Sequence, residues 1–200
     1  MDINGKKAIV FGGTSGIGLS ATQMLSDKGA HVIALSRNPD KLKNVPKNVT
    51  TKKMNVLDRG ALEKFFQEVG EYDILVNSAT GGARAVGPFL SMDLDGYKAS
   101  FDKLWGYTNV VRYGTKFLKD NGNIVLVSGS PARKCRPGQI AISSVGGAVE
   151  AFARGIAPEI APKRINVVSP GIIDTPMSPL QGKEREDYYK NTTNNNLIPR

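Results

Sequence analysis

The stretch that decides the fold is KAIVFGGTSGIG, residues 7–18, in which an apolar run passes through glycines into a helical pattern. Gly12 permits a tight turn, Gly16 lets the backbone approach a ligand without a Cβ in the way, and Gly18 lets the helix lie close to the strand. Unsatisfied N–H groups at the helix start attract anions. The stretch therefore predicts the first strand, phosphate loop and helix start of a dinucleotide-binding unit. A plain strand, loop and helix is the alternative, because glycine-rich turns are common.

Composition predicts one soluble domain over residues 1–200, since 40% hydrophobic and 22% charged residues are ordinary globular usage. No apolar run approaches a membrane span and the first residues do not resemble a signal peptide, so we expect a cytoplasmic protein with no membrane partner. The single cysteine, Cys135, excludes an intramolecular disulfide, and the single histidine, His31, excludes a His-rich metal site. We expect no metal.

The charge balance favours anionic partners, because 27 Lys and Arg against 18 Asp and Glu give a net charge of +9. The basic residues are spread along the chain and form no tract with interleaved aromatics, so we expect no nucleic-acid partner. A phosphorylated cofactor accounts for part of the charge. The run Arg-Lys-Cys-Arg at residues 133–136 predicts a patch for an anionic substrate. A nucleophilic Cys135 is less favoured, because no His or carboxylate lies nearby in the sequence.

Hydrophobic patterning predicts an α/β fold, a Rossmann-like doubly wound parallel sheet of about six strands in a single domain. Asp58 is placed to cap the second helix. Residues 176–200 are polar, with at most a short helix at 183–190, and predict a lid or a frayed tail. The strands are expected at 7–11, 31–36, 50–54, 72–77, 123–127 and 164–168, and the helices at 15–28, 58–69, 94–118 and 145–160.

Four short motifs occur in a fixed order: the glycines of residues 12–18, Asn55-Val56, Asn-Ser-Ala-Thr at 77–80, and Ser-Pro-Gly-Ile-Ile-Asp-Thr at 169–175. Together they resemble the short-chain dehydrogenase/reductase family over nearly the whole chain. The resemblance implies that the second motif contacts adenine and the fourth holds the nicotinamide carboxamide. The cofactor-binding residues that it implies are Gly12, Thr14, Ser15, Gly16, Ile17, Gly18, Ser36, Arg37, Asn55, Val56, Asn77, Ala79, Pro170, Gly171, Ile173 and Thr175.

The end of the second strand favours NADP(H) over NAD(H). It reads Ser36-Arg37 and lacks the acid that would bond an adenine ribose 2′-hydroxyl. Arg37 can give bidentate bonds to a 2′-phosphate, and Thr14 and Ser15 offer hydroxyl donors nearby. The alternative is that Arg37 is only a surface arginine at the start of a loop.

The catalytic positions are where the chain departs from the family. The resemblance implies a Tyr-x-x-x-Lys pair on one helix, a Ser some thirteen residues earlier and an Asn on the preceding helix. Here Ile142 stands at the Tyr position, Gly146 at the Lys position and Gly129 at the Ser position, while Lys103 stands at the Asn position. No tyrosine occurs between Tyr113 and Tyr188, so no shift of register restores the pair.

Two hypotheses follow. In the first, the protein is an oxidoreductase that acts on a small carbonyl or alcohol, Lys103 takes part in proton transfer, and Ser128 and Ser130 orient the carbonyl. The alternatives for these residues are a solvated helix lysine and serines that cap a strand end. In the second hypothesis, the protein binds a dinucleotide without catalysis, as a sensor or an oligomer partner.

Length is a second departure, because the family continues beyond the equivalent of Arg200 into another helix and a seventh strand. We therefore expect six strands in this chain. An oligomer interface formed by a seventh strand is in doubt, and any homo-oligomer would pair through the two long helices. The substrate cannot be identified from the sequence.

Overall fold

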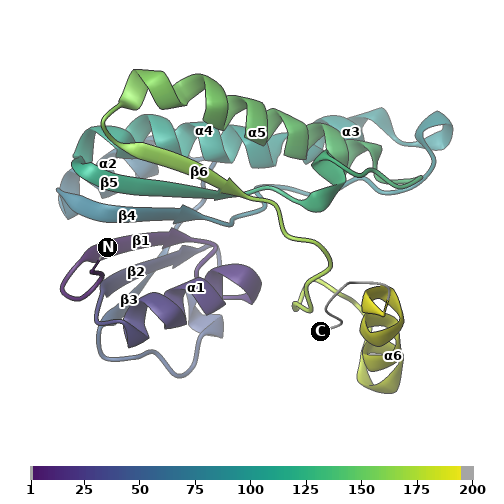
Figure 1. The fold of residues 1–200 in the computed structure, drawn as a ribbon, viewed down its shortest axis with the longest axis horizontal. Coiled ribbons are helices and arrows are strands. Elements are labelled where there is room, and N and C mark those ends of the chain that lie inside the picture. Colours follow the sequence, from purple (N-terminus) through teal and green to yellow (C-terminus); the bar gives the residue numbers. More distant parts are fainter. Residues whose placement is uncertain (1, 195–200) are drawn as a thin grey trace.

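The computed structural model describes residues 2–194, which contain one six-stranded, fully parallel sheet in the order β3-β2-β1-β4-β5-β6 (Figure 1). This confirms the predicted doubly wound Rossmann-like architecture. The order reverses between β1 and β4, and ligands of such sheets bind at the carboxyl ends of the strands beside that reversal. The strands are β1 Lys7–Phe11, β2 His31–Ser36, β3 Val49–Lys53, β4 Tyr72–Asn77, β5 Leu118–Val127 and β6 Arg164–Val168.

Helices cover the two faces of the sheet unequally. On one face α2 packs against α4, and α4 packs against α5, while α1 packs against β1, β2 and β4 on the other face (Figure 1). The α-helices are α1 Gly16–Asp27, α2 Arg59–Val69, α3 Leu94–Ser100, α4 Asp102–Gly114, α5 Ile140–Ile160 and α6 Gly182–Thr193. Short 3-10 turns are η1 Pro39–Lys41, η2 Phe89–Ser91, η3 Thr115–Phe117 and η4 Ser130–Ala132.

The strand residues alternate between two hydrophobic clusters because successive side chains of a strand point to opposite faces. In β1, Ile9 and Phe11 belong to the larger cluster under α2, α4 and α5, while Ala8 and Val10 belong to the smaller cluster under α1. Every residue of β4 is buried, as expected for a central strand covered on both faces. These apolar runs fixed the strand positions in the sequence, and β1, β2, β4 and β6 begin and end where they were predicted.

The predicted cap of α2 is confirmed. The Asp58 carboxylate accepts a hydrogen bond from the Ala61 amide at 2.9 Å, which satisfies one of the free N–H groups of the first turn.

The predicted long helix at residues 94–118 is wrong, because the chain breaks at Phe101 into α3 and α4. The loop after β4 packs against this break. Ser100 Oγ accepts a hydrogen bond from the Ala85 amide at 2.9 Å, and a Cβ on Gly81 would lie 2.5 Å from the Asp102 carbonyl oxygen. The break thus sets the start of α4 against a loop at the carboxyl edge of the sheet.

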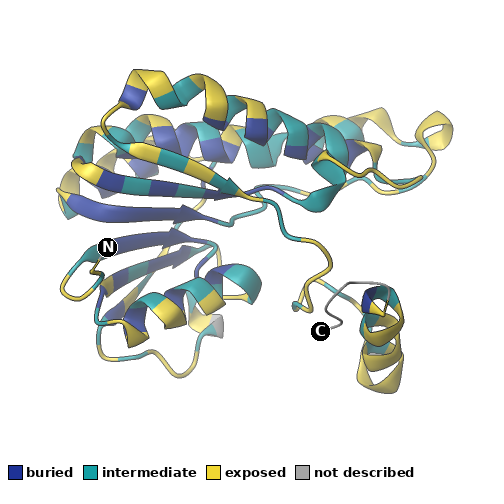
Figure 2. Cartoon of the chain, in the orientation of Figure 1, coloured by how far each residue is buried: buried dark blue, intermediate teal, exposed yellow. Residues whose placement is uncertain are grey.

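Three other elements differ from the prediction by more than one residue. β5 starts at Leu118, five residues early, and its pairing with β4 is irregular near Tyr72. α5 starts at Ile140, and α6 runs over Gly182–Thr193 and is longer than the predicted helix at 183–190. Figure 2 shows α6 mostly exposed and set apart from the sheet.

Helix α5 is long and apolar enough to cross a membrane, with 21 residues and a mean hydropathy of 1.3 in its most apolar window. The prediction that no apolar run approaches a membrane span is therefore wrong, as far as length and composition are concerned. In this fold Val149, Ala153 and Ile160 of α5 belong to the larger hydrophobic cluster. Helices in the core of a soluble protein meet the same criterion of length and composition.

Candidate functional site

The glycine loop joins the end of β1 to α1 at the reversal of the strand order. Gly12 has φ +74°, and Gly16 has φ +52°, so both adopt backbone that side chains rarely allow. A Cβ on Gly18 would lie 2.2 Å from the Gly12 carbonyl oxygen, which is too close for any other residue. The loop therefore brings backbone without side chains to the carboxyl edge of the sheet. The amino end of α1, which includes the N-cap Ser15 and Ile17, lies at the same edge.

Side chains expected near the adenine end lie on neighbouring strand ends. The Thr14 hydroxyl donates to Ser36 Oγ at 2.8 Å, which ties the glycine loop to the end of β2. Arg37 follows directly, and its exposed guanidinium donates to the Gly81 carbonyl at 3.3 Å. Asn55 is exposed after β3, whereas Val56 is 5% exposed and packs inside the fold.

Asn77 ends β4 with an unused donor. Its Oδ1 accepts from the Ala79 amide at 3.1 Å, but its fully buried Nδ2 has no partner among the described residues. A buried donor without a partner costs free energy unless a ligand or water accepts its hydrogen bond. This orphaned donor, the bare glycine loop and the Thr14 to Arg37 cluster fit a phosphorylated dinucleotide.

The loop after β6 closes the other side. A cavity of about 260 Å³ is lined by residues of the glycine loop and of this loop, namely Gly16, Ile17, Ser20, Val168, Pro170, Ile173, Asp174 and Thr175. Five of them are among the expected cofactor residues, so the two predicted halves of the site meet. Gly171 lies exposed in the same loop. Arg185 of α6 holds the loop, because its Nε donates to Asp174 Oδ1 at 2.8 Å and its Nη2 to the Thr175 carbonyl at 2.8 Å.

Lys103 reaches this edge from α4. Its ammonium donates to the Ser128 carbonyl at the end of β5 over 3.2 Å and lies 5.5 Å from the ring centre of Tyr107. Burial, followed by the nearby Arg84 guanidinium, lowers the pKa of Lys103 to about 8. Lys103 therefore loses its proton at a lower pH than a solvated lysine does.

The structure places the residues predicted at the family's Ser, Tyr and Lys positions between the end of β5 and the first turns of α5. Ser128 Oγ donates to the Gly146 carbonyl at 3.1 Å, so this hydroxyl is used within the fold. A Cβ on Gly146 would lie 2.9 Å from the Cβ of Ala132, so the turn η4 sits directly on the backbone of α5. Ser130 starts that turn, and its amide donates to the Pro170 carbonyl at 2.8 Å, which joins the loops after β5 and β6. Gly129 has an extended backbone at φ 176°, and Ile142 lies in the first turn of α5.

Sequence reasoning missed Glu150, a buried carboxylate on α5 one helical turn beyond Gly146. Its Oε1 accepts from Ser169 Oγ at 2.7 Å, and its Oε2 accepts from Arg133 Nε at 3.2 Å. The Ser169 hydrogen bond is the main effect that lowers the pKa of Glu150, and Arg133 lowers it further against the effect of burial. Glu150 thus ties the loops after β5 and β6 together. In the sequence, the signal that could have identified Glu150 was a single acid within an apolar stretch of the predicted helix.

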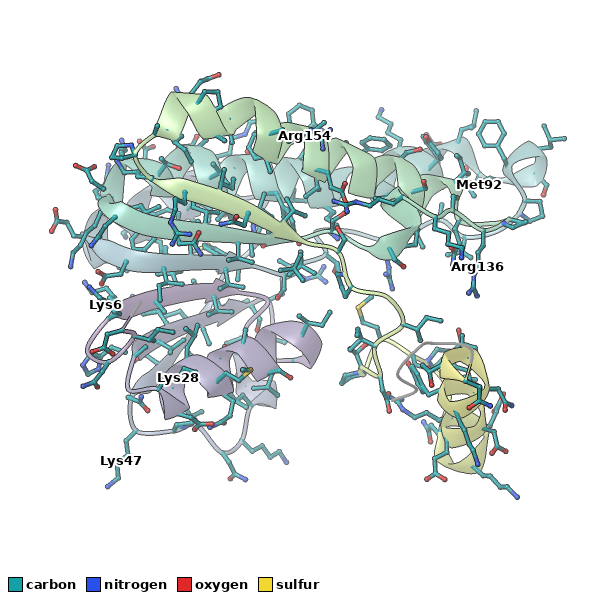
Figure 3. The ribbon with its side chains drawn as sticks, in the orientation of Figure 1. Lys6, Lys28, Lys47, Met92, Arg136 and Arg154 are labelled. Carbon is teal, nitrogen blue, oxygen red and sulfur yellow. The ribbon has the colours of Figure 1, made fainter. Side chains whose placement is uncertain are left out.

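The basic run at residues 133–136 does not act as one patch. Arg133 is paired with Glu150, while Cys135 and Arg136 line a separate open cavity of about 730 Å³ with Pro88, Phe89, Tyr97, Pro137, Gly138 and Ile140. Figure 3 places Arg136 at one end of the molecule and Lys6, Lys28 and Lys47 at the other, so basic side chains are widely spread. Within residues 2–194 no group of three His, Cys, Asp or Glu side chains is arranged to hold a metal ion.

Comparison with known proteins gives a consistent result. Residues 6–186 match the family described as short chain dehydrogenase. The chain is 31% identical over 191 residues to 2,3-dihydro-2,3-dihydroxybenzoate dehydrogenase of Bacillus subtilis, covering 88% of this chain and 72% of that protein. It is 32% identical over 203 residues to the 3-oxoacyl-[acyl-carrier-protein] reductase FabG of Thermotoga maritima, covering 93% and 82%.

The fold is also similar to that of solved structures. A short chain dehydrogenase from Burkholderia cenocepacia, solved in complex with NADP, superposes with a TM-score of 0.82 at 28% sequence identity. The superposition covers 90% of this chain and 77% of that one.

Proposed function

Because this chain belongs to the short-chain dehydrogenase family, we propose that it is an NADP(H)-dependent oxidoreductase that reduces a carbonyl, or oxidises an alcohol, with an unusual proton-transfer set. The curated relatives compared above are named as a dehydrogenase and a reductase of small molecules or carrier-bound acyl groups. A small-molecule substrate and a cytoplasmic location are part of this proposal.

The residues that would hold the cofactor come from three strand ends. The glycine loop and the amino end of α1 would bind the pyrophosphate, and Arg37 with Thr14 would bind a 2′-phosphate. The loop that contains Pro170 and Thr175 would bind the nicotinamide end. When bound, the cofactor donates or accepts the hydride.

Lys103 carries the proposal for proton transfer. Its ammonium is fixed at the end of β5 by the Ser128 carbonyl, and its pKa of about 8 lets it exchange a proton near neutral pH. In reduction, Lys103 Nζ would donate the proton to the developing alkoxide oxygen and become neutral. Of the two serines, Ser130 is the better candidate for orienting a carbonyl, because the Ser128 hydroxyl already donates its hydrogen bond to the Gly146 carbonyl.

The second candidate function is cofactor binding without catalysis. It is favoured by Ile142 and Gly146 at the positions of the family's Tyr and Lys. Trp105 on α4 is 55% exposed, which suits a homo-oligomer that pairs through α4 and α5.

The test compares NADPH oxidation on a panel of small carbonyl compounds for the parent protein and Lys103→Met, which keeps the helix and removes the charge. We expect Lys103→Met to bind NADPH normally and to turn over at least tenfold more slowly, about 1.4 kcal/mol in the barrier. Lys98→Met, an exposed lysine of α3, is the matched control. Equal turnover would remove Lys103 from the mechanism, and NADPH binding without turnover in the parent would establish the second candidate.

A further inference from the structure

The buried carboxylates of Asp73 and Glu150 each pair with a cation, as does the exposed Asp174. Asp73 pairs with Lys6 and Lys119, Glu150 pairs with Arg133, and Asp174 pairs with Arg185. Lys103, which is partly buried, and the exposed Arg84 near it are not paired in this way. Neither Arg84 nor Lys103 has a carboxylate within 4.0 Å among residues 2–194.

The two cations flank the proposed substrate position from different elements. Lys103 Nζ is fixed 3.2 Å from the Ser128 carbonyl, and Arg84 extends from the loop after β4 until its Nη2 lies 3.9 Å from Met177 Sδ in the loop after β6. Arg84 thus spans two of the three loops that surround the carboxyl ends of β4, β5 and β6. Among residues 2–194, this weak contact to sulfur is the one hydrogen bond of the Arg84 side chain, so its donors remain available to a ligand.

The pKa shifts of the two cations agree with the lack of a paired carboxylate. The pKa of Lys103 is lowered by burial and then by Arg84, and the pKa of Arg84 is lowered by burial. A nearby carboxylate would act in the opposite direction, because an opposite charge favours the charged form. Residues 2–194 therefore hold two like charges near each other without a paired carboxylate.

The cofactor does not supply that counter-ion. Its pyrophosphate is expected at the glycine loop after β1, which is two strands from β5 and thus about 10 Å away. Its 2′-phosphate is expected at Arg37, after β2, which is one strand further still. The basic run at 133–136 is also not the recipient, since Arg133 is neutralised and Arg136 faces the separate cavity.

We propose that Arg84 is a specificity-determining residue that binds an anionic oxygen group of the substrate, a carboxylate or a phosphate, so that the substrate is an oxo or hydroxy compound carrying a negative charge near the reacting carbon. Arg84 presents a planar fork of donors that suits both groups. The negative charge would also favour the protonated form of Lys103. This inference rests on the proposed function for the reaction that it specifies, while the binding of the anion itself is independent of turnover.

The experiment uses two matched pairs: a 2-oxo acid against its methyl ester, and dihydroxyacetone phosphate against dihydroxyacetone. We measure kcat/KM with NADPH, and separately titrate each compound into the NADP⁺-saturated protein by calorimetry. We expect the charged member of one pair to be preferred at least tenfold, and the pair that shows this identifies carboxylate or phosphate. Arg84→Gln should reduce the preference at least tenfold, Arg84→Lys should restore part of it, and Arg136→Gln should leave it unchanged.

Two outcomes would overturn the inference: no preference for either charged compound in kinetics and in binding, or a preference that Arg84→Gln leaves intact. Binding of a charged compound that depends on Arg84, with no turnover of any compound, would support the anion site and contradict the proposed catalysis. Turnover of both pairs without charge preference would support catalysis and reject the anion site.

Discussion

If Lys103 is the proton donor that we propose, its protonation state sets how the rates of reduction and oxidation depend on pH. Reduction needs the ammonium form as the acid, so kcat/KM for carbonyl reduction should fall as pH rises through about 8, and alcohol oxidation should rise over the same range. The neighbouring groups are Arg84, which stays charged, and the ring of Tyr107. A pH profile from 6 to 10 measures this.

The matched variants sharpen the pH test. Lys103→Met should lose the inflection near pH 8, whereas Arg84→Gln should move it to higher pH, because a repelling cation is removed while burial remains. An inflection that survives in Lys103→Met would assign the proton to another group.

We propose that Arg37 favours NADP(H) over NAD(H). A charge-assisted hydrogen bond to a 2′-phosphate contributes about 1.5 to 3 kcal/mol, so Arg37→Ala should weaken NADPH binding by roughly that amount and leave NADH binding nearly unchanged. Calorimetric titration of both cofactors at fixed salt measures the difference. Arg59→Ala, an exposed arginine at the start of α2, is the control. Equal affinities of the parent for both cofactors would contradict the choice of NADP(H).

At the scale of elements, Glu150 makes α5 the part that sets two loops against each other. Glu150→Ala would leave the Ser169 hydroxyl and Arg133 without their acceptor, so we expect NADPH to bind several-fold more weakly and stability to fall by about 1 to 3 kcal/mol. Glu150→Gln keeps the shape and one acceptor and should recover most of the stability.

Ser169→Ala distinguishes an effect of Glu150 on the position of the loop after β6 from an effect on the stability of the fold. It removes only the tie to the loop after β6, and it should weaken NADPH binding with little change in the free energy of unfolding measured in urea. Glu159→Gln, an exposed acid on the same helix, is the control. Unchanged NADPH affinity in both Ser169→Ala and Glu150→Ala would show that Glu150 contributes to stability and not to cofactor binding.

The same scale explains what the sequence could predict. Apolar runs between glycines and charged residues placed β1 and β4, because a strand buried on both faces leaves a strong local pattern. The break at Phe101 was not predictable, since it depends on contacts of Ser100 and Asp102 with a loop earlier in the chain. The first turn of α5 was not predicted, because its N-cap residue, Gln139, makes no side-chain capping hydrogen bond.

Site prediction divides in the same way. The glycine loop was predicted from the spacing within one short segment, and Lys103 from the position where the family resemblance implies an Asn. Glu150 and Arg84 were missed because their significance comes from partners on other elements, Ser169 for one and Lys103 for the other.

For the whole molecule, Asp73 links the start of β1, β4 and β5. Its carboxylate is 2% exposed, accepts from the Lys7 amide at 3.0 Å and lies 3.3 Å from the ammonium groups of Lys6 and Lys119. Burial raises the pKa of Asp73, but these three groups together hold it below its usual value of 3.8. The stabilisation is therefore present at neutral pH and is lost as pH falls below about 4 through the lower value of the folded protein.

Asp73→Asn should consequently reduce the free energy of unfolding by roughly 1 to 3 kcal/mol at pH 7, and the difference from the parent should shrink at pH 3. Urea denaturation at both pH values measures this. Asp120→Asn, whose exposed carboxylate pairs with Lys163, should change stability by less than about 1 kcal/mol. A constant difference between Asp73→Asn and the parent across pH would show that the charge of Asp73 is not the cause.

The sheet order has a consequence for self-association. The edges of the described sheet are β3 and β6, and an edge strand offers unpaired backbone groups to any other strand. On β3, the exposed ammonium groups of Lys52 and Lys53 discourage such pairing, whereas β6 carries Ile165, Val167 and a half-exposed Val168 after Arg164. We therefore expect a strand from another chain to pair with β6 and not with β3. It would then lie next to the loop that begins at Ser169.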